Sequence, residues 1–200
     1  RGKKTYDLPR VTVAEGVIST AEIANAQELN PAITPDKFQR IIEEKYSADI
    51  MFLIQQANLR SEQLKSEQMN ALHNEIKAAT EAPNKELTNI NVASYASPDG
   101  GVKLNTTLAE NREKNTVNYM KKSLKKGKID ADMTAEFTAQ DWEGFKELVS
   151  KSNIQDKELI LNVLSMYSDP EQREREIKNM SSVFKVLAEE ILPQLRYSRI

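Results

Sequence analysis

The sequence has no cysteine, one histidine and one tryptophan among its 200 residues. The absence of cysteine excludes a disulfide framework, thiol catalysis and cysteine-bound zinc, although it is compatible with an oxidising compartment. The single histidine, His73, excludes a metal site with several histidine ligands, and a Ser-His-Asp triad would have to use this residue. Because His73 follows an apolar position of an amphipathic pattern, we predict that it lies at the surface of a helix.

Cofactor patterns and long apolar runs are also missing. No Walker or dinucleotide glycine pattern occurs, and no apolar run approaches the roughly 20 residues that a membrane-spanning helix needs. The chain opens with Arg1 instead of methionine and has no signal peptide, so we expect it to be a piece of a longer protein. We expect no enzyme activity, no cofactor, no metal and no membrane span in this part of that protein.

The charges nearly cancel. With 28 basic and 30 acidic residues, the formal net charge is -2, which argues against a general nucleic-acid binder. A short basic run contains Lys121, Lys122, Lys125, Lys126 and Lys128. We interpret it as a solvated helix end whose cations suit the helix dipole. The alternative is an electrostatic contact with an anionic polymer or lipid.

The chain divides into an N-terminal extension, 1–46, and a main domain, 47–200. In the extension, valines and an isoleucine between Val11 and Ile18 favour a strand. A loop follows, and the spacing of apolar residues predicts a short helix over 35–46 with Thr34 as its cap.

Strands and helices alternate through the first half of the main domain. The pattern predicts a strand over 48–54, a helix from a Ser61 cap to about Thr80, and a strand over 89–96. Ser97–Gly101 is a glycine-containing turn, and a helix is expected over 105–122, with Gly127 as a stop.

The last third of the chain is predicted to be helical until its final residues. We expect a helix after the cap residue Asp141, a second over 157–167, and a third from Pro170 towards Glu190. Residues 195–200 could form a closing strand. We therefore predict an α+β fold with helices on one face of a small mixed sheet, and with the insertion point of the last strand left open.

The block 48–120 resembles the family of domains similar to the C-terminal domain of outer membrane protein A, the OmpA-like family. The family pattern is a strand, a helix, a second strand, a glycine turn, and a helix that opens Asn-x-x-Leu-Ser-x-x-Arg-Ala. Here the stretch 91–120 reads NVASYASPDGGVKLNTTLAENREKNTVNYM. The positions that match without a gap are Gly100, Asn105, Leu108, Arg112, Tyr119 and Met120.

The resemblance implies a β-α-β-α-β sandwich, with a helical insertion at about 125–190 before the last strand. It also implies a non-enzymatic module of the cell envelope, in the periplasm or at the outer membrane, that tethers a longer protein to peptidoglycan. The Tyr-Ala-Ser-Pro-Asp-Gly variant looks like a branch associated with envelope proteins of the Bacteroidetes.

In the family, an aspartate and an arginine bind the diaminopimelate of the peptidoglycan stem peptide. The implied ligand-binding residues of this chain are Ser97, Asp99, Gly100, Asn105 and Arg112. An arginine suits the carboxylate of that ligand because its guanidinium can bond it at two points. The backbone N–H groups at a helix N-terminus add affinity for an anion.

Three positions depart from the family pattern. The ligand-binding aspartate falls on Ser97, and the family's serine and alanine fall on Ala109 and Glu113. Losing a charge-assisted hydrogen bond at Ser97 costs about 1.5–3 kcal/mol. Asp99 could replace the missing carboxylate or could be an ordinary turn residue.

Arg112 could likewise be a structural residue that pairs with Glu110, Glu113 or a turn carbonyl. The alternative function is thus a structural or protein-interaction domain of an envelope protein that no longer binds peptidoglycan. In that case the helices after Lys125 would form a docking surface for another envelope protein.

Overall fold

The computed structural model describes residues 2, 3 and 40–200, and Glu44–Ile200 forms one compact unit. The strand expected between Val11 and Ile18 lies outside the described residues, as does the first part of the helix expected over 35–46. Residues 40–46 have no helical turn, so that prediction is wrong for this part. Ile41 and Ile42 are 86% and 71% exposed, so within the described part of the chain this segment has no apolar partner on which a short helix could pack.

The fold is mixed α+β, as predicted, and its sheet has four strands in the order β1-β4-β2-β3. The strands are β1 (Asp49–Met51), β2 (Ile90–Tyr95), β3 (Met133–Thr138) and β4 (Tyr197–Arg199). β4 runs antiparallel to β1 and β2, while β2 and β3 are parallel. The closing strand therefore inserts at the centre of the sheet, which settles the point that the sequence left open.

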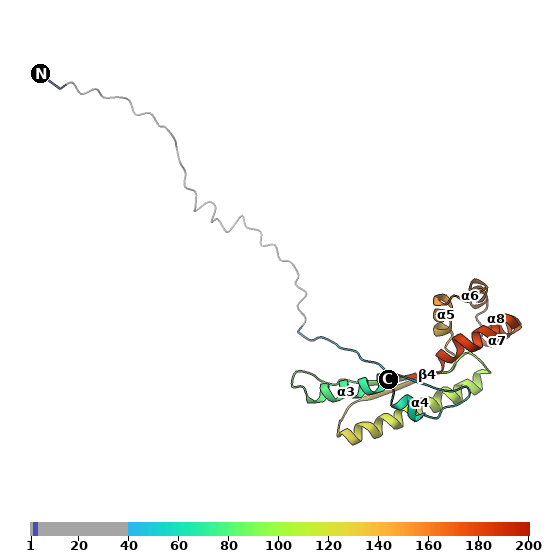
Figure 1. The fold of residues 1–200 in the computed structure, drawn as a ribbon, viewed down its shortest axis with the longest axis horizontal. Helices are drawn as coiled ribbons and strands as arrows, with labels where there is room; N and C mark the ends of the chain where they lie inside the picture. Colours follow the sequence, from blue (N-terminus) through green and yellow to red (C-terminus); the bar gives the residue numbers. More distant parts are fainter. Residues whose placement is uncertain (1, 4–39) are drawn as a thin grey trace. The chain divides into compact units, whose positions relative to one another are not determined.

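Helices α3 (Glu67–Glu81) and α4 (Val102–Gly127) lie on one face of this sheet (Figure 1). The core between them contains apolar residues from both helices and from alternate strand positions, such as Met69, Ile50 and Val92, each fully buried. Alternation along a strand sends every second side chain to this face. The helical spacing that predicted a helix over 61–80 is therefore confirmed for its buried face.

That predicted helix is nevertheless broken near its start. A short helix, α2 (Ser61–Leu64), ends before α3 begins, and Ser66 caps α3 by accepting a hydrogen bond from the Met69 N–H at 3.3 Å. Ser61 lies inside α2 and is not the cap, so that prediction was wrong. Ser66 supplies a better start signal because Glu67 follows it in the first turn.

Strand β3 corrects the expectation that residues 125–190 are entirely helical. It pairs in parallel with β2 along six residues, from Ile90 opposite Met133 to Tyr95 opposite Thr138. Five of its six residues are exposed, so no alternating apolar pattern marked it as a strand. Its β-favouring residues, including Thr134 and Phe137, were the available signal.

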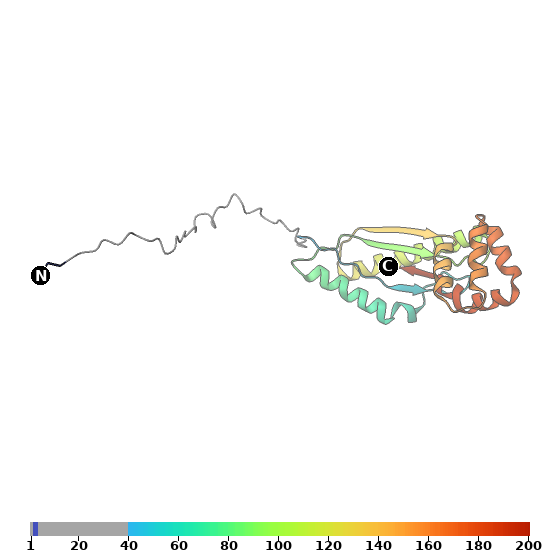
Figure 2. The same cartoon turned by 90° about the horizontal axis from the view of Figure 1, so that it is seen from above.

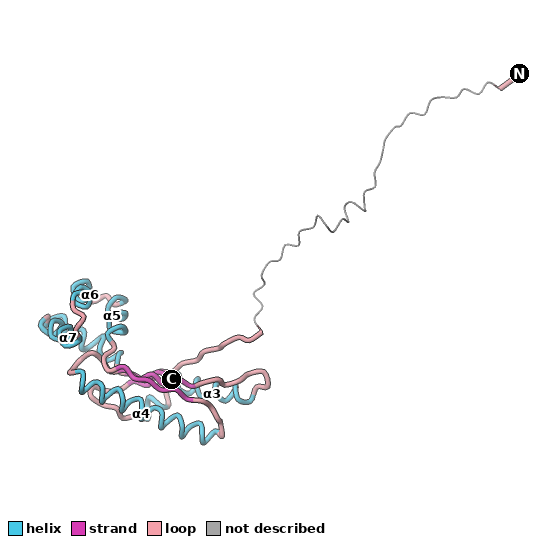
Figure 3. The backbone as a smooth tube through the Cα atoms, turned by 180° about the vertical axis from the view of Figure 1, so that it is seen from behind, coloured by secondary structure: helices cyan, strands magenta, loops and turns pink. Residues whose placement is uncertain are grey.

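The remaining helices form a bundle with its own apolar core. They are α5 (Trp142–Lys151), α6 (Lys157–Met166), α7 (Pro170–Asn179) and α8 (Ser181–Val186), followed by η1 (Leu187–Ile191) and η2 (Leu192–Leu195). Asp141 caps α5 as predicted, since its carboxylate accepts from the Gly144 N–H at 2.8 Å. The helix predicted from Pro170 to Glu190 is interrupted at Met180. The bundle lies at the end of the sheet where β1, β2 and β3 finish (Figures 2 and 3).

Candidate functional site

The turn Ser97–Gly101 connects β2 to α4, and the structure places it where the bundle meets the sheet. Gly100 has φ = 112°, a conformation that favours glycine, so the predicted glycine turn is confirmed. Asn105 is 3% exposed, and its amide donates to the carbonyls of Ser97 and Gly100, both at 3.1 Å. The helix therefore begins by satisfying the backbone acceptors of its own entry turn.

Arg112 lies on the buried face of α4 and is 1% exposed. Its guanidinium donates to three backbone carbonyls: Gln56 at 3.0 Å, Tyr95 at 2.8 Å and Leu53 at 3.3 Å. Phe52 lies beneath it, with the ring centroid 4.9 Å from the guanidinium carbon. Arg112 thus joins the segment after β1 to the last residue of β2.

The partners of Arg112 bear on the two roles that the sequence allowed, a ligand-binding and a structural one. Glu110 pairs with Lys114 at 2.6 Å, and the three acceptors that bond the Arg112 guanidinium are backbone carbonyls. Burial, together with the nearby charge of Arg196, lowers the pKa of Arg112 to about 10. The residue is still a cation at neutral pH, and carbonyl dipoles take the place of a carboxylate around it.

Ser97 and Asp99 are joined by an arginine that the sequence analysis did not select. Arg196, 8% exposed, donates from Nε to the Ser97 Oγ at 3.2 Å, and its Nη2 lies 3.7 Å from the Asp99 carboxylate. Burial lowers the pKa of Arg196, and Asp99 acts against that shift. The signal for Arg196 was its place just before the closing strand, but only the central position of β4 brings it to the turn.

Helix α7 supplies two further side chains to the same turn. Glu174 accepts a hydrogen bond from the Gly100 N–H at 2.8 Å and is bonded by Lys178 at 2.5 Å. Lys178 also lies 3.7 Å from the Asp99 carboxylate. Since the Gln140 amide donates to the Gly100 carbonyl at 3.0 Å, both backbone polar groups of Gly100 have partners within the chain.

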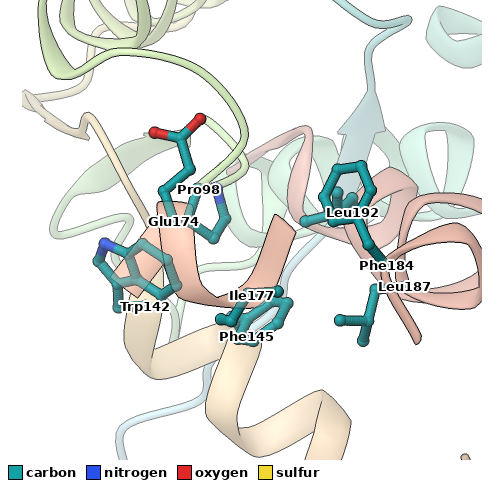
Figure 4. Close-up of a pocket in the computed structure, with 8 residues that line it drawn as sticks. All are labelled: Pro98, Trp142, Phe145, Glu174, Ile177, Phe184, Leu187 and Leu192. Carbon is teal, nitrogen blue, oxygen red and sulfur yellow. The ribbon is translucent and has the colours of Figure 1, made fainter. Parts of the chain in front are cut away.

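The interface between turn and bundle has almost no free space. A cavity of about 10 Å³ is lined by Pro98 and by apolar residues of the bundle, including Trp142 and Phe145 (Figure 4). This volume is at the lower limit for one water molecule. Trp142 is 9% exposed and contacts Phe145 edge-on, with the two ring centroids 5.7 Å apart, so it is a core residue of the bundle.

Four of the five predicted site residues lie together, and the fifth lies apart from them. Ser97, Asp99, Gly100 and Asn105 come together at the turn, whereas Arg112 bonds the carbonyl of Tyr95, two residues before Ser97. The turn is positioned as the sequence suggested, but the groups that a ligand would use are engaged with residues of the chain itself.

His73 has a different environment from the one predicted, because it is partly buried between α3 and α4. Its Nδ1 lies 2.7 Å from the Met69 carbonyl, and its Nε2 lies 3.0 Å from the Ser123 hydroxyl. A ring that donates to Met69 can accept from Ser123. The His73–Ser123 hydrogen bond links α3 to α4. The group that orients the His73 ring is the Met69 carbonyl, one turn earlier on the same helix, where a catalytic triad would have a carboxylate.

Two further features are absent from residues 2, 3 and 40–200. No group of three or more histidine, cysteine or acidic residues is arranged to hold a metal. None of the helices in these residues is long and apolar enough to cross a bilayer.

Comparison with known proteins does not assign the chain to a family. No protein-family model matches it, and searches of curated proteins and of solved structures likewise give no match.

Proposed function

We propose that this chain is a non-enzymatic module of a longer cell-envelope protein and acts there as a structural or protein-interaction domain. The envelope location rests on the resemblance of 48–120 to the OmpA-like family. The loss of peptidoglycan binding rests on the turn, where the Glu174 carboxylate bonds the Gly100 N–H at 2.8 Å. A ligand carboxylate at that position would have to displace this carboxylate from the same chain.

Asp99 supports the same conclusion. It would have to replace the missing aspartate at Ser97 and bind the ligand ammonium, but Lys178 and Arg196 already lie 3.7 Å from it on two sides. A third cation at this carboxylate would be repelled by both. The outer face of α6 offers an interaction surface instead, because Leu159 and Met166 lie seven residues apart and are 50% and 71% exposed.

Peptidoglycan tethering is the second candidate, and one observation favours it. Two buried cations, Arg112 and Arg196, lie close enough for the charge of Arg196 to lower the pKa of Arg112. An excess of buried positive charge favours an anionic ligand. Binding would require the bundle to separate from the turn and the segment 53–57 to release Arg112.

Calorimetric titration with a muropeptide that contains diaminopimelate distinguishes the two candidates. We expect no saturable heat from the wild-type chain at millimolar ligand. Saturable binding would overturn the proposal in favour of tethering.

The variants in this titration are Glu174→Ala and Arg112→Lys. Glu174→Ala frees the Gly100 N–H, so binding that appears only in this variant would support closure by the bundle. Arg112→Lys keeps the charge but loses the planar donor set. Its failure to weaken any binding seen in the wild type would place the ligand elsewhere.

A further inference from the structure

The two edge strands of the sheet, β1 and β3, differ in the partners of their outward-facing backbone groups. On β1, Ala48 and Phe52 donate backbone hydrogen bonds to Ile200 and Arg196, at 3.0 and 2.7 Å, so Met51 between them faces outward. The outward N–H of Met51 donates to the Gln63 side chain at 3.1 Å, and its carbonyl accepts from Arg60 at 3.2 Å. Side chains therefore close this edge at Met51.

The edge formed by β3 is not covered by any strand of the described residues. The Ile90 N–H donates to the Asp132 carbonyl at 2.9 Å, and the Ala96 N–H donates to the Thr138 carbonyl at 3.1 Å. In a parallel ladder this assigns the even-numbered residues of β3 to β2 and turns the N–H and C=O groups of Met133, Ala135 and Phe137 outward. Among the described residues, β3 has a strand neighbour on one side only (Figure 2).

The residues of β3 are not of the kinds that prevent an edge strand from pairing with another strand. Its sequence, MTAEFT, contains no lysine or proline and one charge, Glu136, and residues 134–138 are all exposed. Phe137 is 42% exposed. Exposed edges of this length are normally blocked by lysine, proline, a bulge or a covering segment, because they can pair with another strand.

We propose that β3 is a self-association edge, pairing antiparallel with β3 of a second copy of this chain in a register centred on Ala135. In this register Ala135 lies opposite itself, and Met133 lies opposite Phe137 of the second copy. All three outward-facing residues of each strand then form hydrogen-bonded pairs. The result is a continuous eight-stranded sheet.

Charge and apolar contacts both favour this register. It places Glu136 opposite Thr134 of the second copy, whereas a register centred on Glu136 would place two carboxylates directly opposite each other. It also covers Phe137 with a methionine side chain. The single register between these two would put side chains on the wrong face.

Helix α4 leaves room for the second copy. It packs above β2 and β3, so with strands about 4.8 Å apart its copy would lie roughly 10–14 Å away across the two-fold axis. Packed helices approach to about 8–10 Å, so the two helices would not collide.

Single-cysteine variants test both the association and its register, since the chain has no cysteine of its own. In the proposed register the two Ala135 Cα atoms would be about 5.5 Å apart, within the range of a disulfide. We expect Ala135→Cys to form an intermolecular disulfide under mild oxidation at least about tenfold faster than Glu136→Cys, whose Cα atoms would lie beyond about 7 Å. Equal rates, or a faster Glu136→Cys, would overturn the register.

The molecular mass of the full 200-residue chain tests the association itself. We expect sedimentation of the wild type to approach twice 22.7 kDa as concentration rises to millimolar. Ala135→Pro removes an outward N–H without removing a bond to β2, and should weaken association by about tenfold or more. A wild type that stays monomeric would overturn the proposal. The proposal concerns the strand edge alone and does not depend on whether the turn binds a ligand.

Discussion

The sheet with its two covering helices and the four-helix bundle differ in what they contribute to the turn. The sheet layer provides the turn itself, with Gly100 at φ = 112° and Asn105 bonded to its carbonyls. The bundle provides Glu174 and Lys178, which occupy the polar groups of that turn. Local sequence thus determines where a site could be, and a distant segment determines whether it is open.

We expect the largest loss of stability from a substitution in the core of the sheet layer. Arg112→Ala removes the partner of three backbone carbonyls and leaves a cavity beside Phe52, so we expect the free energy of unfolding to fall by about 3–5 kcal/mol. Urea denaturation followed by circular dichroism measures this change. Arg112→Lys is the matched control, since it keeps a cation and one or more of the bonds. A loss below about 1 kcal/mol for the alanine variant would contradict the structural role.

We expect a smaller loss of stability from a substitution that removes the contact between the bundle and the turn. Glu174→Ala removes a carboxylate that bonds both the Gly100 N–H and Lys178, and we expect a loss of about 1–3 kcal/mol. Glu174→Gln retains an acceptor for Gly100, so it should lose less in the same urea experiment. If both variants matched the wild type, the contact between Glu174 and Gly100 would have no energetic role.

We expect the smallest loss of stability from Tyr197 of strand β4, and only at alkaline pH. Burial, with a contribution from Asp141, raises the pKa of Tyr197 to about 12 from an ordinary value of 10.0. Between these pH values the unfolded chain loses a proton that the folded chain retains. The stabilising contribution is therefore complete below about pH 10 and is lost as the pH rises towards 12.

Tyr197→Phe should remove the last step in the near-ultraviolet titration of tyrosinate and should flatten the alkaline loss of stability. Tyr95 stacks on Tyr197 with ring centroids 4.7 Å apart, and phenylalanine preserves this contact. Tyr119→Phe, on the opposite side of the sheet layer, is the control. An unchanged last step in Tyr197→Phe would show that another tyrosine titrates there.

The elements near the turn were predictable because their signals are local. The alternating strand β2, the turn glycine and the helix that follows could be identified from residue spacing alone. Strand β3 was missed because its exposed residues carry no alternation, and its pairing with β2 is made by the backbone. Glu174 was missed because 74 residues separate it from Gly100, and no local pattern indicates a contact over that distance.

The exchange rate of the Gly100 amide hydrogen tests closure of the turn most directly. Because its N–H is bonded to Glu174 beneath the bundle, we predict slow exchange in the wild-type chain and fast exchange in Glu174→Ala, with the amides of β2 unchanged between the two. Fast exchange of Gly100 in the wild type would mean that the turn is open, and would contradict the account.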